Sequence, residues 1–79
     1  MVRNPSDSLR ATLADNIKAF RSKKGLSQEG LAELCGLHRT YIGSVERQER
    51  NVTLSTLEVL SAALEVRVPE LLTKQKSKR

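Results

Sequence analysis

Residues 39–44 place hydrogen-bonding side chains at spacings that a helix would bring to one surface. If this stretch is helical, Arg39, Thr40, Tyr41 and Ser44 share its start and outer face, while its apolar residues point inward. An arginine there can donate two hydrogen bonds to the O6 and N7 atoms of guanine, and a threonine can bond a base or contact a thymine methyl. These residue types therefore indicate recognition of nucleic-acid bases.

Further polar residues flank this stretch at positions suited to phosphate oxygens. Gln28 lies at the start of the preceding expected helix, and Arg47, Arg50 and Asn51 follow the stretch. Helix N-termini and guanidinium groups often bind DNA phosphates, and such contacts set the register of a protein on the duplex. We therefore add these four residues to the expected DNA-binding set. For Tyr41 the alternative is packing against the domain itself.

Two short helices joined by a glycine turn are expected to position these side chains. Ser27 is a suitable N-cap for the first of them. Gly36 ends that helix, because glycine adopts a positive φ without strain, and Ala32 supplies the small side chain that a steep helix crossing needs. The inward positions carry Leu31, Cys35, Leu37, Ile42 and Val45. This arrangement describes a helix-turn-helix unit.

Helical spacing also recurs on both sides of the unit. Apolar stripes are formed by Leu9, Leu13, Ile17 and Phe20 in a first helix and by Leu54, Leu57, Leu60 and Leu64 in a fourth. Thr53 can cap the fourth helix, and Pro69 can open a fifth. The sequence therefore predicts an all-α fold, a compact five-helix domain over residues 9–73. A short arm (1–8) precedes it, and a basic tail (74–79), expected to be disordered, follows.

The length and the charge distribution of the chain narrow its possible functions. The chain has 79 residues, enough for one small domain, and a net charge of +5. Residues 1–24 carry six basic and two acidic side chains, and residues 74–79 carry four basic and no acidic ones. Positive charge at both ends suits a polyanionic partner, although basic tails also serve solubility alone.

The chain offers little for catalysis or metal binding. Cys35 is the single cysteine and His38 the single histidine, so an internal disulfide is excluded and a metal site is not expected. With no catalytic constellation and no glycine-rich phosphate loop, we expect no enzyme activity and no cofactor. No apolar run has the length of a membrane span, and the N-terminus is unlike a signal peptide, which predicts a cytoplasmic location.

The stretch LSQEGLAELCGLHRTYIGSVERQERNVTLSTLEVL resembles the lambda-repressor/Cro (XRE-like) helix-turn-helix family, and the resemblance runs from about Leu13 to Leu72. Within that family, HRTYIGSVERQERN is most similar to controller proteins of restriction–modification systems, which are short and dimeric. The resemblance implies a DNA-binding domain whose third helix enters the major groove of a palindromic operator. His38 and Gly43 depart from the family, which usually has Ser or Asp at the first position and often Ser at the second.

The resemblance also implies three further contacts. An ion pair between Arg21 and Glu46 would hold the third helix against the first. Glu29 and Glu33 match acidic residues that touch the RNA polymerase sigma subunit in similar activators; the alternative is a solvated acidic face. The dimer contact falls in the C-terminal region, where apolar residues remain after the core is filled: Val66, Val68, Leu71 and Leu72. In a monomer these four residues would instead close the core.

Two other functions stay open. A phage-type or chromosomal repressor would share the fold and the DNA-binding residues. An antitoxin or adaptor would mainly bind a protein and use the helix-turn-helix as a scaffold, although an antitoxin usually needs an extension to wrap its toxin, for which the six tail residues offer little. Our hypothesis is a dimeric, sequence-specific transcription regulator of the controller type.

Overall fold

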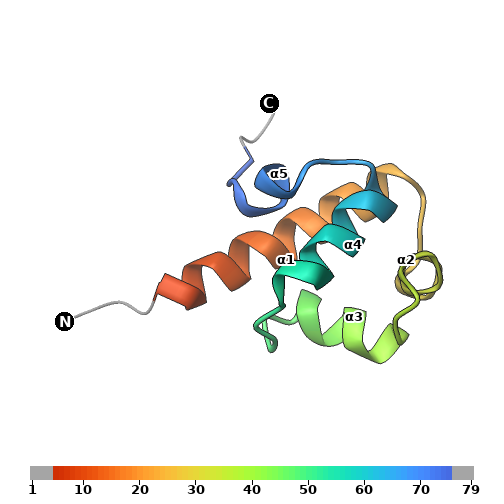
Figure 1. The fold of residues 1–79 in the computed structure, drawn as a ribbon, viewed down its shortest axis with the longest axis horizontal. Coiled ribbons are helices and arrows are strands. Elements are labelled where there is room, and N and C mark those ends of the chain that lie inside the picture. The colour runs from red at the N-terminus through yellow and green to blue at the C-terminus, as the bar shows by residue number, and fades with distance from the viewer. Residues whose placement is uncertain (1–4, 76–79) are drawn as a thin grey trace.

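The computed structural model describes the backbone of residues 5–75 and the side chains of residues 8–75. The described chain forms five helices and no strand, as predicted (Figure 1). Their bounds are α1 (Pro5–Lys23), α2 (Gln28–Cys35), α3 (Arg39–Glu46), α4 (Leu54–Leu64) and α5 (Val68–Leu72). None of the helices in this part of the chain is both long and apolar enough to cross a membrane.

Helix α1 begins earlier than the sequence predicted. It starts at Pro5, inside the segment assigned to the arm, because the fixed φ of proline suits the first turn of a helix and its missing N–H has no partner to lose there. Residues 1–4 of the arm and residues 76–79 of the tail lie outside the described residues, so those two assignments stay predictions.

Local hydrogen bonds set most of the other helix ends. The Oγ of Ser27 accepts the N–H of Gly30 at 2.9 Å, and Oγ1 of Thr53 accepts the N–H of Thr56 at 3.1 Å, so both predicted N-caps are present. Gly36 ends α2 with φ 67°, and the next N–H, that of Leu37, reaches back into the helix. These contacts satisfy groups that a helix end leaves unpaired.

The core lies where α1, α2, α3 and α4 meet, and α5 closes it. Its largest fully buried side chains are Ile17, Leu31, Ile42, Leu60, Leu64 and Leu71. Helix α1 packs against both α3 and α5, which lie at opposite edges of the molecule in Figure 1. Buried Asn16 fastens α5 to α1, because its Nδ2 donates to the carbonyl oxygens of Leu71 and Thr73 at 2.8 and 2.9 Å. No local pattern in the sequence marks this residue.

Three leucines of the helices are exposed, and two of them, Leu9 and Leu54, belong to the predicted apolar stripes. Leu9 is 49% exposed, Leu34 61% and Leu54 80%. Each lies near the end of its helix, where the neighbouring helices no longer cover the apolar face. The spacing was therefore helical as predicted, but the position of the surrounding helices left these side chains on the surface.

Candidate nucleic-acid interface

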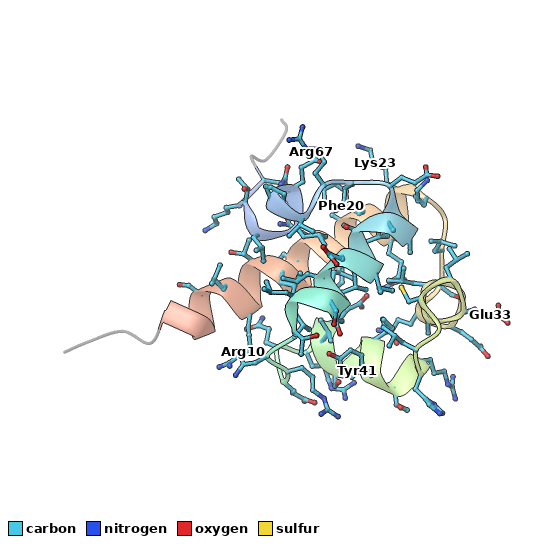
Figure 2. All side chains as sticks on the ribbon, viewed as in Figure 1. Arg10, Phe20, Lys23, Glu33, Tyr41 and Arg67 are labelled. Atoms are coloured by element: carbon cyan, nitrogen blue, oxygen red, sulfur yellow. The ribbon has the colours of Figure 1, made fainter. Side chains whose placement is uncertain are left out.

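Helix α3 presents its N-terminal turn to solvent. Arg39 and Thr40 are exposed there, and Tyr41 is half-buried on the same short helix. Figure 2 shows Tyr41 at the edge of the molecule that α3 forms, with Arg10 of α1 at the same edge. The inner side of α3 is filled by the buried Ile42 and Val45. The helix therefore has the apolar inner face and polar outer turn that the sequence predicted.

The orientation of α3 depends on a buried carboxylate at its last residue. Glu46 is 6% exposed and accepts Nε and Nη2 of Arg21 at 2.8 and 3.0 Å, the ion pair that the resemblance predicted. Nη1 of Arg21 also donates to the carbonyl oxygen of Leu26 at 3.0 Å. The hydrogen bond with Glu46 raises the pKa of Arg21, which favours the charged guanidinium. A two-pronged bond of this kind fixes direction as well as distance.

Gln28, a predicted phosphate contact, takes part in the same network. Its Nε2 donates to Oε1 of Glu46 at 2.9 Å, so one carboxylate joins α1, α2 and α3. Gln28 also lines a surface hollow of about 180 Å³ with Arg39, Thr40, Gly43 and Arg47. Its side chain therefore lies at the predicted interface, and its hydrogen bond to Glu46 also gives it a positioning role that its sequence position did not indicate.

Arg50 and Tyr41 form a stacked pair beside α3. The Arg50 guanidinium lies 5.4 Å from the centre of the Tyr41 ring, within the range of a cation–π contact. Nε of Arg50 donates to Oγ of Ser44 at 3.0 Å, and that hydroxyl donates to the carbonyl oxygen of Tyr41 at 2.7 Å. The two Nη groups of Arg50 have no partner among the described residues, so they can bind an external acceptor.

Ser44 is placed differently from the prediction. The sequence predicts it on the outer face of the helix as a DNA contact, but it is only 6% exposed and its hydroxyl makes two hydrogen bonds within the protein. The half-buried ring of Tyr41 and the guanidinium of Arg50 close over this side of α3. Ser44 therefore acts on the surface through Arg50, which it orients.

Arg10 is a surface residue that was not among those predicted from the sequence to bind DNA. Its Nη1 donates to Oδ1 of Asn51 at 2.6 Å, although the two residues are 41 positions apart. The contact brings a cation of α1 next to the loop after α3, beside Arg50. Only the general excess of basic residues in the first part of the chain could have hinted at it, because nothing local marks this position.

The two departures from the family pattern have visible consequences. His38 occupies the N-cap position of α3 and makes no side-chain capping bond, unlike the caps of α2 and α4. Gly43 is buried, and a Cβ added there would lie 3.2 Å from Nη1 of Arg47. The missing side chain thus leaves room for the Arg47 guanidinium to lie against α3.

The acidic residues of α2 adjoin the start of α3. Glu29 and Glu33 are exposed and line a hollow of about 400 Å³ together with His38 and Arg39. Their separation of four residues places them on one face of the helix. An acidic surface therefore lies directly next to the polar turn of α3.

The predicted dimer residues divide into two groups. Leu71 is fully buried in the core of the single chain, so its side chain has no surface left for a partner, in contrast to the prediction. Val66, Val68 and Leu72 are half-buried. Leu72 lines an apolar groove of about 270 Å³ that continues to Arg10, Arg50 and Asn51; its apolar lining consists of Leu9, Leu13, Val52, Leu54, Leu57 and Leu72.

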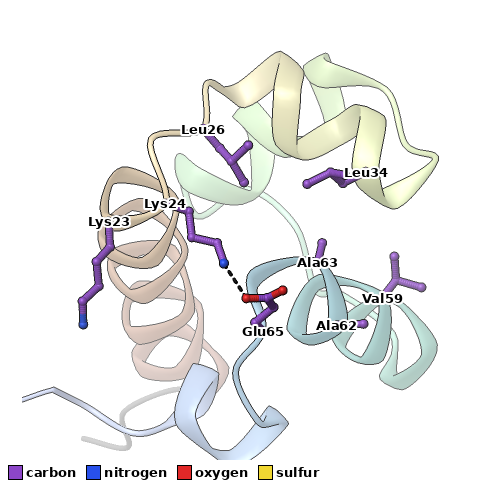
Figure 3. A pocket seen from close by; sticks show the side chains of 8 residues that line it. All are labelled: Lys23, Lys24, Leu26, Leu34, Val59, Ala62, Ala63 and Glu65. Atoms are coloured by element: carbon purple, nitrogen blue, oxygen red, sulfur yellow. Dashed lines mark hydrogen bonds and ion pairs between the residues drawn. The ribbon is translucent and has the colours of Figure 1, made fainter.

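A second apolar groove lies between α2 and α4 (Figure 3). It is lined by Leu26, Leu34, Val59, Ala62 and Ala63, and Nζ of Lys24 bonds Oε1 of Glu65 at 2.6 Å on its rim. Its lining residues include none of the predicted DNA-binding residues. This groove is therefore separate from the polar surface of α3.

Comparison with known proteins agrees with this geometry. Residues 17–71 match the helix-turn-helix family. The control protein C.SmaI of Serratia marcescens is 61% identical over 67 residues, which cover 85% of this chain and 80% of that protein.

Two solved structures are also similar. The restriction-modification controller protein C.AhdI from Aeromonas hydrophila has a TM-score of 0.75 and 44% identity, covering 78% of this chain and 94% of that one. A hypothetical transcription factor from Neisseria has a TM-score of 0.84 and 49% identity, covering 87% and 78%. The resemblance found in the sequence is confirmed, and the chain belongs to the helix-turn-helix family.

Proposed function

We propose that this chain is a sequence-specific DNA-binding transcription regulator, not an enzyme, which controls the genes of a restriction–modification system. The observation that carries the proposal is the exposed first turn of α3, with Arg39 and Thr40, on a helix whose last residue, Glu46, is bonded to Arg21 of α1. The similarity to control proteins supports the choice of target genes. Because genomic DNA is the proposed ligand, we place its action in the cytoplasm.

The surface divides into base-reading and phosphate-binding residues. Arg39 and Thr40 would meet base edges when α3 lies in the major groove, because they open the helix and are exposed. Arg50, oriented by Ser44 and Tyr41, and the Arg10–Asn51 pair lie beside the helix and would bind phosphates or the outer bases. Phosphate contacts place the helix, and base contacts select the sequence.

The test is the Arg39→Ala variant on two DNA duplexes, an operator selected from a random pool and a scrambled sequence. We expect a loss of roughly 1–3 kcal/mol at the operator and relaxed choice of base at one position, because a bidentate guanine contact is removed. Lys23→Ala, which removes a cation remote from α3, should change binding little. Equal losses on both duplexes would assign Arg39 to phosphate and contradict its role as a base reader.

We further propose that the regulator acts as a homodimer. One recognition helix reads too few base pairs to select a genomic site, and two-fold proteins solve this with half-sites about 34–36 Å apart. The groove lined by Leu9, Leu54 and Leu72 is the surface we assign to a second copy. Arg50 and Asn51 also border this groove, so a symmetric contact through its leucines would place the expected DNA-binding residues of both copies next to the dimer contact.

We also propose that the acidic face of α2 contacts the RNA polymerase sigma subunit when the regulator activates transcription. Two observations support it: Glu29 and Glu33 are exposed, and they border the turn of α3 that would enter the groove. A polymerase bound to the adjacent DNA would therefore meet these carboxylates directly.

A further inference from the structure

Glu49 is an exposed acidic residue in the loop after α3, next to the basic residues Arg47 and Arg50. The last residue of α3, Glu46, is also acidic, but it is buried and bonded to Arg21 and Gln28. Glu49 has a side chain that is 54% exposed, and it bonds Arg47, whose side chain is 62% exposed. An anion beside DNA opposes binding, so the presence of Glu49 here needs an explanation.

The turn after α3 brings Glu49 back to Arg47. Gln48 adopts a left-handed conformation with φ 67°, and the N–H of Glu49 bonds the carbonyl oxygen of Ser44 at 2.9 Å. The carboxylate then accepts Nε of Arg47 at 3.0 Å and Nη2 at 3.3 Å. These bonds lower the pKa of Glu49 below its ordinary value, so the carboxylate is ionised at neutral pH.

Arg47 belongs to the same surface as the expected base readers. It lines a hollow with Gln28, Arg39 and Thr40, and its Nη1 lies 3.2 Å from the place that a Cβ on Gly43 would occupy. The Arg47 guanidinium therefore lies against α3, where it bonds Glu49 on one side and packs over Gly43 on the other.

Two oxygens of a phosphate and the two oxygens of a carboxylate bind the same edge of a guanidinium. Both bind its planar fork through two parallel N–H bonds, so the Nε–Nη2 edge of Arg47 cannot serve Glu49 and a phosphate together. While Arg47 is bonded to Glu49, the two side chains together add no net charge to the surface. Sequence-independent binding depends on the number of phosphates that cations neutralise.

We propose that Glu49 is an affinity-setting residue that competes with DNA phosphate for Arg47. Glu49 lowers the sequence-independent part of the DNA affinity, and its ion pair with Arg47 breaks when α3 binds DNA. This inference rests on the proposed DNA-binding function. Because a phosphate contact does not read sequence, the competition acts on operator and random DNA alike.

The experiment measures binding of the full chain to operator and scrambled duplexes by fluorescence anisotropy over a series of salt concentrations. Glu49→Gln keeps the size of the side chain and removes its charge. We expect binding to both duplexes to strengthen by up to about fivefold per subunit, the upper range for one exposed ion pair. On scrambled DNA the plot of log K against log salt should steepen by about 0.9 per subunit, for one more phosphate neutralised.

Glu65→Gln is the matched control. It removes the same charge from another exposed ion pair, that of Glu65 with Lys24 at the end of α4, which borders the groove between α2 and α4. Its effect should stay below about twofold, because exposed charges far from the DNA are screened. Glu49→Gln should also have little effect in an Arg47→Gln background, since the competed cation is then absent.

Three results would overturn the inference. One is a Glu49→Gln variant that binds no better than Glu65→Gln. Another is weaker binding of the operator alone, which would make Glu49 a support that orients Arg47 for a base. The third is an undiminished gain in the Arg47→Gln background. If the wild type prefers its operator, each of these three results contradicts only the inference about Glu49 and leaves the proposed DNA-binding function intact. A wild type that binds neither duplex would contradict both the inference and the proposed function.

Discussion

At the scale of single residues, Glu46 shows how a buried charge can be tolerated and useful. Its carboxylate accepts three hydrogen bonds, two from Arg21 and one from Gln28. Removing one partner of such a network is costly because the remaining charge stays buried without compensation. The network therefore restricts α3 to one orientation, which a helix that reads base edges requires.

The uncapped start of α3 leads to a prediction about His38. It occupies the N-cap position with extended backbone angles but makes no capping bond. We expect His38→Ser to raise the free energy of unfolding by about 1 kcal/mol, because the serine hydroxyl can accept an orphan N–H of the first turn. Urea denaturation of both proteins measures this. Thr53→Ala, which deletes the cap of α4, should lower stability by a similar amount, and a His38→Ser protein no more stable than wild type would contradict the argument.

At the scale of elements, α3 and α5 are too short to be stable alone. They have 8 and 5 residues, below the length at which isolated helices persist in water. Helix α3 depends on Glu46 and its buried apolar face, and α5 depends on Asn16 and Leu71. The elements that carry the proposed function are therefore ordered by tertiary contacts rather than by their own helix propensity.

The acidic face of α2 is the element for which a transcription test is decisive. Glu29→Lys combined with Glu33→Lys should abolish activation in a reporter assay while operator binding remains, because the two side chains lie outside the turn of α3. Glu58→Lys on α4 combined with Glu65→Lys at its C-cap makes the same charge change and should leave activation unchanged. Normal activation by the α2 variant would mean that these glutamates form only a solvated face.

At the scale of the whole molecule, exposed leucines distinguish a dimer from a monomer. Leu54 is 80% exposed, so Leu54→Asp should leave the core intact but place a charge in the proposed dimer contact. We expect wild type to sediment as a dimer at micromolar concentration and the variant as a monomer with weaker operator binding. Leu34→Asp, in the groove between α2 and α4, is the control and should remain dimeric.

A charged substitution at Leu71 would not test the dimer, because Leu71 is fully buried and the change would disrupt the core. A wild-type chain that sediments as a monomer even on a palindromic operator would contradict the dimer proposal. If Leu34→Asp were the variant that sediments as a monomer, the dimer contact would be assigned to the groove between α2 and α4 instead.

The sequence by itself determined the features that depend on near neighbours. The caps Ser27 and Thr53, the left-handed turn at Gly36 and the apolar spacing within each helix involve residues a few positions apart. Those interactions follow from the local geometry of a helix, so their residue types predicted five helices and the polar turn of α3 correctly. The ion pair between Arg21 and Glu46 was predicted from the family resemblance and not from local spacing.

Only the tertiary structure decided which side chains are covered and which distant groups meet. Arg10 bonds Asn51 across 41 positions, and Asn16 bonds the end of α5 across more than 50. Ser44 turned inward because Arg50 and Tyr41 close over it, and Leu54 remained outside because no helix packs there. Burial depends on the positions of all surrounding helices at once, and the pattern along one helix carries no information about where its neighbours end.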